Sequence, residues 1–111
     1  MKLSKELVKG STAMLVMSVM RGQDMYGYQI IKAIANRSEH VFDMKEGTLY
    51  PILHSLEEEG LLESYWEGEG RKRKYYHLTQ KGATELERQA KEFQVFSGAV
   101  HKVLGGESFA Y

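Results

Sequence analysis

The chain has 111 residues, enough for one small domain and one further element, and its 15 basic and 15 acidic residues leave no net charge. It has no cysteine, which excludes disulfide bonds, thiolate catalysis and cysteine-based zinc sites. Hydrophobic residues make up 42% of it, enough for a core. The lack of cysteine suits a cytoplasmic protein. The apolar run at residues 14–20 is shorter than the ~20 residues that span a bilayer and precedes no signal-peptide cleavage site, so we expect a buried helix there.

Two helices are predicted in the first third of the chain. The first covers residues 6–20, and its apolar surface is wider than one stripe, so it should be buried on most sides. The polar run at residues 21–24 ends it. A second helix is predicted over residues 26–36, and the connection that follows can form a very short strand at residues 41–44.

The third predicted helix has the clearest periodicity. Pro51 is tolerated in the first turn, so the helix should begin near Gly47, and Gly60 provides a left-handed stop. Tyr50 and His54 fall on the face away from the leucines. The residues that keep the amphipathic spacing are Leu49, Ile52, Leu53 and Leu56.

Two strands should follow, over Leu62–Glu67 and residues 74–79, because both segments are rich in aromatic residues. The sequence Gly68-Glu69-Gly70 between them is typical of a turn. The tip and returning arm of this hairpin carry consecutive cations, Arg71, Lys72, Arg73 and Lys74.

A final helix is predicted from Gln80, capped by Thr79. It contains a heptad seam, interrupted by a polar residue and by Gly98 beside it. An isolated helix is marginally stable in water, so the seam needs a partner. The seam consists of Leu86, Ala90, Phe93, Ser97, Val100 and Leu104.

Three helices, a basic hairpin and a last helix form the winged helix-turn-helix layout, a mainly α fold with a small β-hairpin. We assign residues 1–79 to a DNA-binding domain and residues 80–111 to a dimerisation helix. The third helix can enter the major groove with its N-terminal end, and the hairpin can supply cations to phosphates or the minor groove. The candidate DNA-binding residues are Tyr26, Lys45, Gly47, Thr48, Tyr50, Pro51, His54, Arg71, Lys72, Arg73 and Lys74.

Three motifs in this order resemble the PadR family of bacterial transcriptional regulators, in its compact branch with a single short C-terminal helix. They are MYGYQI at residues 25–30, EGTLYPILHSLE at residues 46–57 and GRKRKYYHLTQKG at residues 70–82. The resemblance implies a cytoplasmic homodimer, usually a repressor, that dimerises through its last helix and is released from DNA in some members by phenolic acids or bulky drugs. It also implies that Tyr26 and Tyr50 lie at the DNA face. Lys72 departs from the family, whose members often have proline there.

A small-molecule effector would bind between the first and last helices or within the dimer interface. Methionine and phenylalanine suit flat apolar molecules, although the same residues also suit an ordinary dry dimer core. The candidate residues are Leu7, Met14, Met17, Leu86, Ala90, Phe93, Phe96 and Val100.

Other interpretations of single features remain open. A run of cations is usually a solvated surface, and both tyrosines at the expected DNA face can be ordinary half-buried residues. His54 and the glutamates after it have metal-ligand spacing, but a lone histidine there is more often a surface residue, so no metal or cofactor is predicted. Trp66 is expected to pack on the wing strand.

Other functional classes fit the sequence less well. It has no phosphate-binding glycine loop, no nucleophile elbow and no paired catalytic carboxylates, so an enzyme is not predicted. A protein-interaction module that uses the basic hairpin on an acidic partner is the main alternative. A winged helix of the MarR kind would need long helices at both ends.

Overall fold

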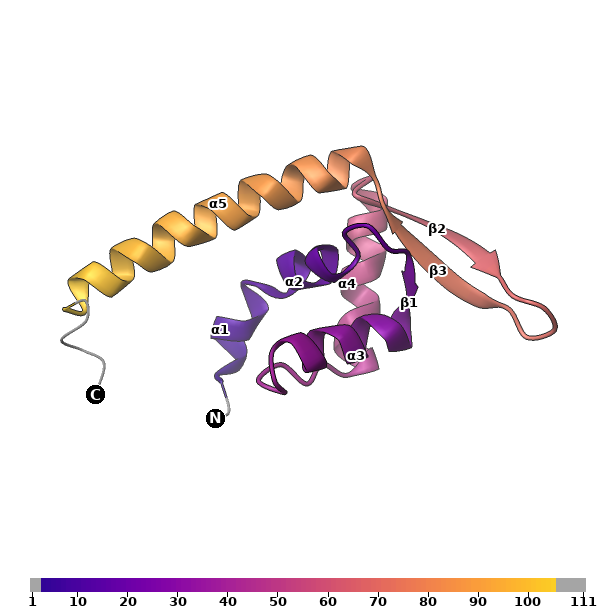
Figure 1. Ribbon diagram of the computed structural model, residues 1–111, viewed down its shortest axis with the longest axis horizontal. Coiled ribbons are helices and arrows are strands. Elements are labelled where there is room, and N and C mark those ends of the chain that lie inside the picture. The colour runs from indigo at the N-terminus through magenta and orange to yellow at the C-terminus, as the bar shows by residue number, and fades with distance from the viewer. Residues whose placement is uncertain (1–2, 106–111) are drawn as a thin grey trace.

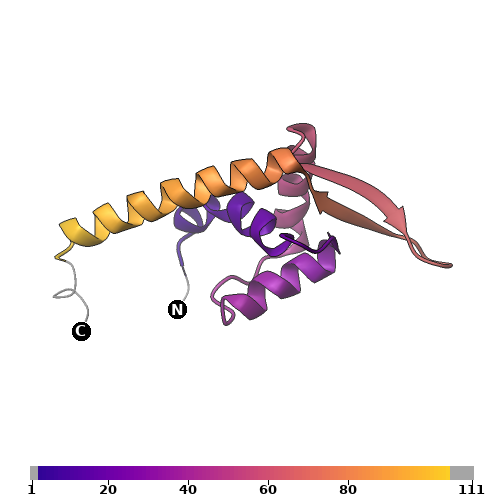
Figure 2. The same cartoon turned by 45° about the horizontal axis from the view of Figure 1, so that its top comes forward.

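A helical domain carries two extensions that leave it in opposite directions (Figure 1). This computed structural model describes residues 3–105, except the side chains of Lys5 and Leu7, and measures 56 × 28 × 22 Å. Figure 2 shows the same arrangement from a second direction, with the hairpin on one side and the last helix on the other. The elements in chain order are α1 (Lys5–Lys9), α2 (Thr12–Val19), β1 (Met25–Tyr26), α3 (Gly27–Arg37), α4 (Glu46–Glu58), β2 (Leu62–Glu67), β3 (Arg73–Leu78) and α5 (Gln80–Val103).

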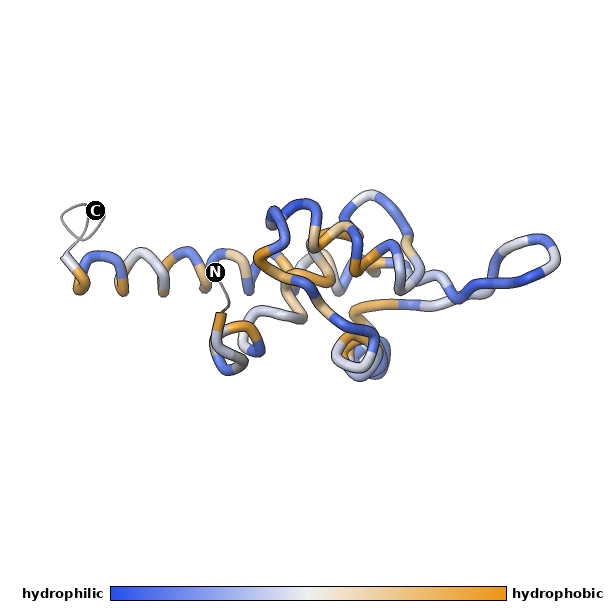
Figure 3. The backbone as a smooth tube through the Cα atoms, turned by 90° about the horizontal axis from the view of Figure 1, so that it is seen from below, coloured by the Kyte–Doolittle hydropathy of each residue, from blue (hydrophilic) through white to orange (hydrophobic). Residues whose placement is uncertain are grey.

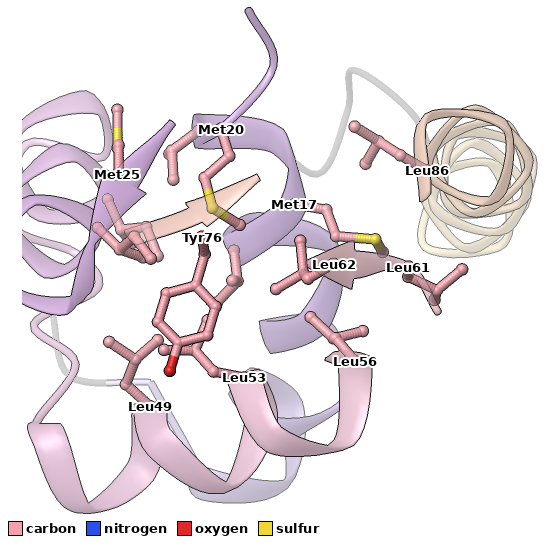
Figure 4. Packing of buried hydrophobic residues seen from close by; sticks show 14 residues of the cluster. Met17, Met20, Met25, Leu49, Leu53, Leu56, Leu61, Leu62, Tyr76 and Leu86 are labelled. Atoms are coloured by element: carbon pink, nitrogen blue, oxygen red, sulfur yellow. The ribbon is translucent and has the colours of Figure 1, made fainter. Parts of the chain in front are cut away.

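The core lies where α2, α3 and α4 meet the base of the hairpin (Figure 4). The leucines of α4 face inward, as their spacing predicts, and Leu49 and Leu53 are fully buried. Tyr76 of β3 is also buried there, and Leu86 anchors the first part of α5 to the domain. The hairpin and α5 therefore extend from one rigid base.

The sheet has three antiparallel strands in the order β1-β3-β2. The two hairpin strands were predicted within one residue of their observed bounds, but the proposed strand at residues 41–44 is wrong, because that segment is irregular. The third strand is β1, in which Met25 lies opposite Tyr76 of β3. Two residues are too few to show a strand pattern, so β1 depends on its pairing with β3.

The prediction of one helix over residues 6–20 is also wrong. The structure divides this segment into α1 and α2, with a turn at Gly10 and Ser11. Both residue types disfavour the helix interior, glycine through its backbone freedom and serine by competing for backbone hydrogen bonds. The Thr12 hydroxyl donates to the Lys9 carbonyl across the turn at 3.2 Å.

Helix α4 begins at Glu46, one residue earlier than predicted, so Pro51 lies in its second turn rather than its first. Proline cannot donate the hydrogen bond that would reach the carbonyl of Gly47. Both residues are exposed, so water can replace that bond. The predicted stop is confirmed, since Gly60 has a φ of 76° directly after the helix.

Helix α5 begins at Gln80, and the predicted cap is confirmed, because the Thr79 hydroxyl accepts the N–H of Gly82 at 3.0 Å. The helix passes so close to the chain before β2 that a Cβ on Gly82 would lie 2.1 Å from the carbonyl oxygen of Leu61. No helix within residues 3–105 has the length and apolar character needed to cross a membrane.

The close approach at Gly82 gives a stability prediction. Gly82→Ala should lower the free energy of unfolding by about 2 kcal/mol, because backbone must move to admit the methyl group. Gly98→Ala is the matched control in the same helix, since a Cβ there meets nothing within 4 Å of the chain, and it should stabilise the protein by up to about 1 kcal/mol. Urea denaturation measures both. Equal effects of the two substitutions would contradict the packing described.

Candidate nucleic-acid interface

A groove of about 640 Å³ lies between the hairpin and the N-terminal ends of α3 and α4. The ends of both helices leave backbone N–H groups unpaired and carry the positive pole of the helix dipole, so they favour an anion. The lining residues are Tyr26, Gly27, Tyr28, Glu46, Tyr50, Trp66, Arg71, Lys72, Arg73, Lys74 and Tyr76.

The structure therefore brings six of the eleven candidate DNA-binding residues together in this groove: Tyr26, Tyr50, Arg71, Lys72, Arg73 and Lys74. The remaining five lie outside the lining but are all exposed. They follow the N-terminal end and outer face of α4, and they are Lys45, Gly47, Thr48, Pro51 and His54.

Tyr50 reaches from α4 to the start of α3. A Cβ on Gly27 would lie 2.6 Å from the Tyr50 hydroxyl oxygen, so the tyrosine ends in space that only a glycine leaves open. The ring is 46% exposed, which leaves part of it available to a ligand in the groove. The backbone N–H of Tyr26, the N-cap residue of α3, donates to the Gln29 side chain at 3.2 Å.

The four cations of the hairpin differ in their surroundings. Arg71 and Lys72 are exposed in the loop at its tip. The guanidinium of Arg73 lies 4.9 Å from the ring centroid of Tyr26, within cation–π range, and both residues line the groove. Figure 3 shows the hairpin tip as a hydrophilic loop far from the hydrophobic core.

Lys74 is turned back toward α4. Its ammonium lies 3.9 Å from the carboxylate of Glu57, whose other oxygen accepts a hydrogen bond from Ser64. Glu57 lies near the C-terminal end of α4, yet it reaches a cation of the hairpin. Both side chains of the pair are partly exposed, so the pair is weak, but it partly neutralises Lys74.

The outer face of the sheet carries a polar cluster that joins all three strands. Asp24, directly before β1, accepts the Tyr65 hydroxyl of β2 at 2.6 Å and lies 2.8 Å from Nδ1 of His77 on β3. The Tyr65 ring stacks on Tyr75 at 5.8 Å. Asp24 therefore ties both hairpin strands to the segment that leads into α3.

The charge of Asp24 is stabilised by these contacts. The hydrogen bond from Tyr65 is the main cause that lowers the pKa of Asp24 below its ordinary 3.8; partial burial opposes it and His77 adds to it. The same carboxylate raises the pKa of Tyr65 to about 12. Both shifts favour the pair of a charged carboxylate and a neutral phenol.

His54 is not part of a metal site in the described chain. Its side chain is 75% exposed and lies 3.5 Å from Glu58. Within residues 3–105 no group of three or more metal-ligating side chains is arranged to hold an ion.

Within one chain the candidate effector residues do not line one groove. Met17 and Leu86 are 0% and 1% exposed and belong to the domain core. Met14, Phe93 and Phe96 line an open groove of about 700 Å³ between the first helices and α5. Ala90 is half-buried and Val100 lies farther along α5, exposed, whereas the side chain of Leu7 lies outside the described residues.

Trp66 is the residue that the sequence interpretation placed most incorrectly. We expected it to pack on the wing strand, but 64% of it is exposed, and it lines the groove. Strand alternation carried the missing signal, since Trp66 lies on the same face as Ser64 but two pairs farther from the core. Asp24 was missed because its partners are distant in sequence.

The link between Asp24 and Tyr65 predicts a pH-dependent stability difference. Tyr65→Phe keeps the ring but removes the hydroxyl, so it should lower the free energy of unfolding by about 1 kcal/mol at neutral pH. The folded-state pKa of Asp24 lies below its ordinary value of 3.8. The hydrogen bond therefore stabilises the fold fully above about pH 3.8, and this stabilisation is lost as the pH falls through the lower folded-state pKa. Denaturation at about pH 7 and about pH 3 should therefore show the difference shrinking in acid.

Tyr75→Phe is the matched control, because no hydrogen bond within residues 3–105 involves its hydroxyl. It should leave stability nearly unchanged at both pH values. A Tyr65→Phe effect of the same size in acid as at neutral pH would show that the hydroxyl does not act through the charge of Asp24.

Comparison with known proteins agrees with this architecture. A transcriptional regulator from Clostridium thermocellum matches the structure with a TM-score of 0.84 and 28% identity, over 88% of this chain and 97% of that one. A PadR family transcriptional regulator from Eggerthella lenta DSM 2243 matches with a TM-score of 0.81 and 36% identity, over 90% of this chain and 87% of that one.

The sequence relationships point the same way. The transcriptional regulator YqjI of Escherichia coli K12 is 31% identical over 86 residues, which are 78% of this chain, although this chain spans only 41% of YqjI. The sequence model of the transcriptional regulator PadR-like family matches residues 16–88. The family-model match extends from α2 through the groove to the first part of α5. The chain therefore belongs to the PadR-like family of transcriptional regulators, and its winged helix is that of a DNA-binding regulator rather than an enzyme.

Proposed function

We propose that this protein is a repressor that binds a palindromic operator as a homodimer. The observation that supports it best is the groove in which the N-terminal ends of α3 and α4 and the cations of the hairpin face one space. Repression requires no contact beyond DNA binding, because a dimer bound over a promoter excludes polymerase. Such a regulator works where the DNA is, in the cytoplasm.

In the proposed complex α4 enters the major groove by its N-terminal end. Lys45, Gly47 and Thr48 are exposed at that end, and Tyr50 and His54 follow on the outer face, where base edges lie within reach. Arg71 and Lys72 at the tip of the hairpin contact neighbouring phosphates or the minor groove. The remaining candidates, Tyr26, Pro51, Arg73 and Lys74, help to form the wall of the interface.

The second half of α5 supports the homodimer and a division into residues 1–79 for DNA binding and residues 80–111 for dimerisation. Hydrophobic residues recur along one side of the helix beyond the domain (Figure 3). Phe93, Phe96 and Val100 are 46%, 64% and 40% exposed. Monomeric proteins rarely expose such a continuous apolar face, so a second copy of α5 is its natural cover.

The groove beside Met14, Phe93 and Phe96 is the proposed place for a planar apolar effector. A ligand would release DNA only if it preferred a dimer geometry that separates the two copies of α4 from their half-sites. A thermal-shift screen of aromatic compounds tests this, and a binder that acts equally on Phe93→Ala would show that the site lies elsewhere.

The dimer is tested by the oligomeric state and the footprint. Sedimentation at micromolar concentration should show a dimer, and selection from a random duplex pool should return two half-sites about 10 bp apart or a multiple of that. Phe93→Asp should shift the protein to monomers and weaken operator binding, whereas Val95→Asp, 67% exposed and off the seam, should not. One unrepeated half-site would count against the homodimer.

The hairpin is tested by salt dependence. Arg71→Ala and Lys72→Ala should each lower the slope of log affinity against log salt by about one, because each removes a phosphate contact. Lys74→Ala should lower the slope less, since Glu57 already partly neutralises Lys74. Tyr50→Ala or His54→Ala should change sequence preference instead. Anisotropy titrations with labelled duplex measure all of these.

Lys91→Ala, an exposed change on α5 far from the hairpin, is the control for loss of one positive charge. Parental slopes in both tip variants would exclude a phosphate-binding role for the hairpin. Binding to acidic proteins but not to duplex DNA would favour an interaction module instead.

A further inference from the structure

We infer that Trp66 is a DNA-contacting residue whose indole packs on the sugar–phosphate backbone of duplex DNA held in the groove. The inference rests on the proposed docking of this groove on DNA and adds to it a contact that carries no charge.

Trp66 lies on the groove face of the sheet. In β2 it is paired with Lys74 of β3, and alternation puts it on the same side as Ser64, which bonds to α4. The core ends at Tyr76, two pairs closer to the domain, so Trp66 projects beyond the part of the sheet that the core supports. The groove lining places it with Arg71 and Lys72.

The indole takes part in no polar or ring contact of the described chain. It is 64% exposed, and within residues 3–105 no aromatic pair, cation–π contact or hydrogen bond involves it. On the other face of the sheet Tyr75 packs against both Tyr65 and Tyr26, and Tyr26 also lines the groove. The other aromatic residue of β2, Tyr65, stacks on a neighbouring ring, whereas the Trp66 ring stays exposed to water. We therefore expect a ligand to cover it.

The chemistry of the groove identifies that ligand. Four cations and one carboxylate, that of Glu46, line the groove, so its charge favours an anionic ligand, yet an indole gains most from an apolar surface. A DNA backbone offers both within a few ångströms, since deoxyribose presents C–H groups between phosphates and a phosphate oxygen can accept the indole N–H. The opposite wall carries Tyr28 and Tyr50, which are 56% and 46% exposed and extend the same mixed surface.

The chain offers a direct measurement, because Trp66 is its single tryptophan. Emission from the wild-type protein reports this side chain without a label. Adding a random-sequence duplex at low salt should change its intensity and shift its maximum to shorter wavelength as water leaves the ring. A contact with the DNA backbone does not depend on base sequence, so the random duplex should produce most of the emission change that the operator produces.

Two substitutions separate the ring from its N–H group. Trp66→Ala should weaken duplex binding about tenfold, as expected for a buried aromatic anchor, and Trp66→Phe should weaken it about threefold. Neither removes a charge, so the salt slope should stay parental, in contrast to the cation variants. Val95→Ala is the control for loss of an equally exposed apolar side chain, 67% exposed on α5, and should bind like the wild type.

The outcomes are distinct. If anisotropy shows that the wild type binds labelled duplex while Trp66 emission stays constant and Trp66→Ala binds within twofold of the wild type, this inference is overturned and the proposed function stands. A larger emission change with a single strand of equal length would also overturn it, because that signals stacking on unpaired bases. If the wild type binds no duplex at low salt, the proposed function fails as well.

Discussion

The pairing of β3 on both of its edges is the constraint on which the molecule depends. β3 lies between β1, which leads into α3, and β2, which leaves α4. Its alternation puts Tyr76 and Lys74 on the side of α4 and puts Tyr75 and His77 on the outside. A shift of one residue would exchange these faces, exposing Tyr76 and removing His77 from Asp24. The orientation of the hairpin relative to α4 therefore follows from one register.

Local sequence patterns were sufficient to predict an element whose structure depends only on its own residues. The spacing of Leu49, Leu53 and Leu56 predicted α4, and Thr79 predicted the start of α5. These patterns were insufficient where the structure depends on a residue distant in the sequence. β1 exists only through Met25 and Tyr76, and the pairing of Glu57 with Lys74 joins residues that lie on different elements. Met17 and Leu86 show the same limit, because their apolar character suits a ligand wall as well as the core they form.

A neutral chain can present a basic surface because its charges are separated in space. Two acidic residues of α5 are paired within that helix, since Glu85 accepts two hydrogen bonds from Arg88 and Glu92 accepts one. Glu57 partly neutralises Lys74, whereas Arg71 and Lys72 at the tip of the hairpin are exposed. Since screening confines each field to roughly 10 Å, a distant carboxylate has little effect at the groove. Affinity then follows the local balance of the hairpin rather than the net charge.

The seating of Tyr50 against Gly27 has a consequence for how the two positions can change. The space left by the missing Cβ of Gly27 accommodates the Tyr50 hydroxyl, so the ring already packs against α3 before any ligand arrives. Ordering a free side chain on binding costs about 0.5–1.5 kcal/mol, and a tyrosine that is already ordered avoids much of this entropy loss. The two positions are thus constrained as a unit. A bulkier residue at 27 would be compatible with the same fold only if residue 50 became shorter, and related proteins should show the two sizes varying inversely.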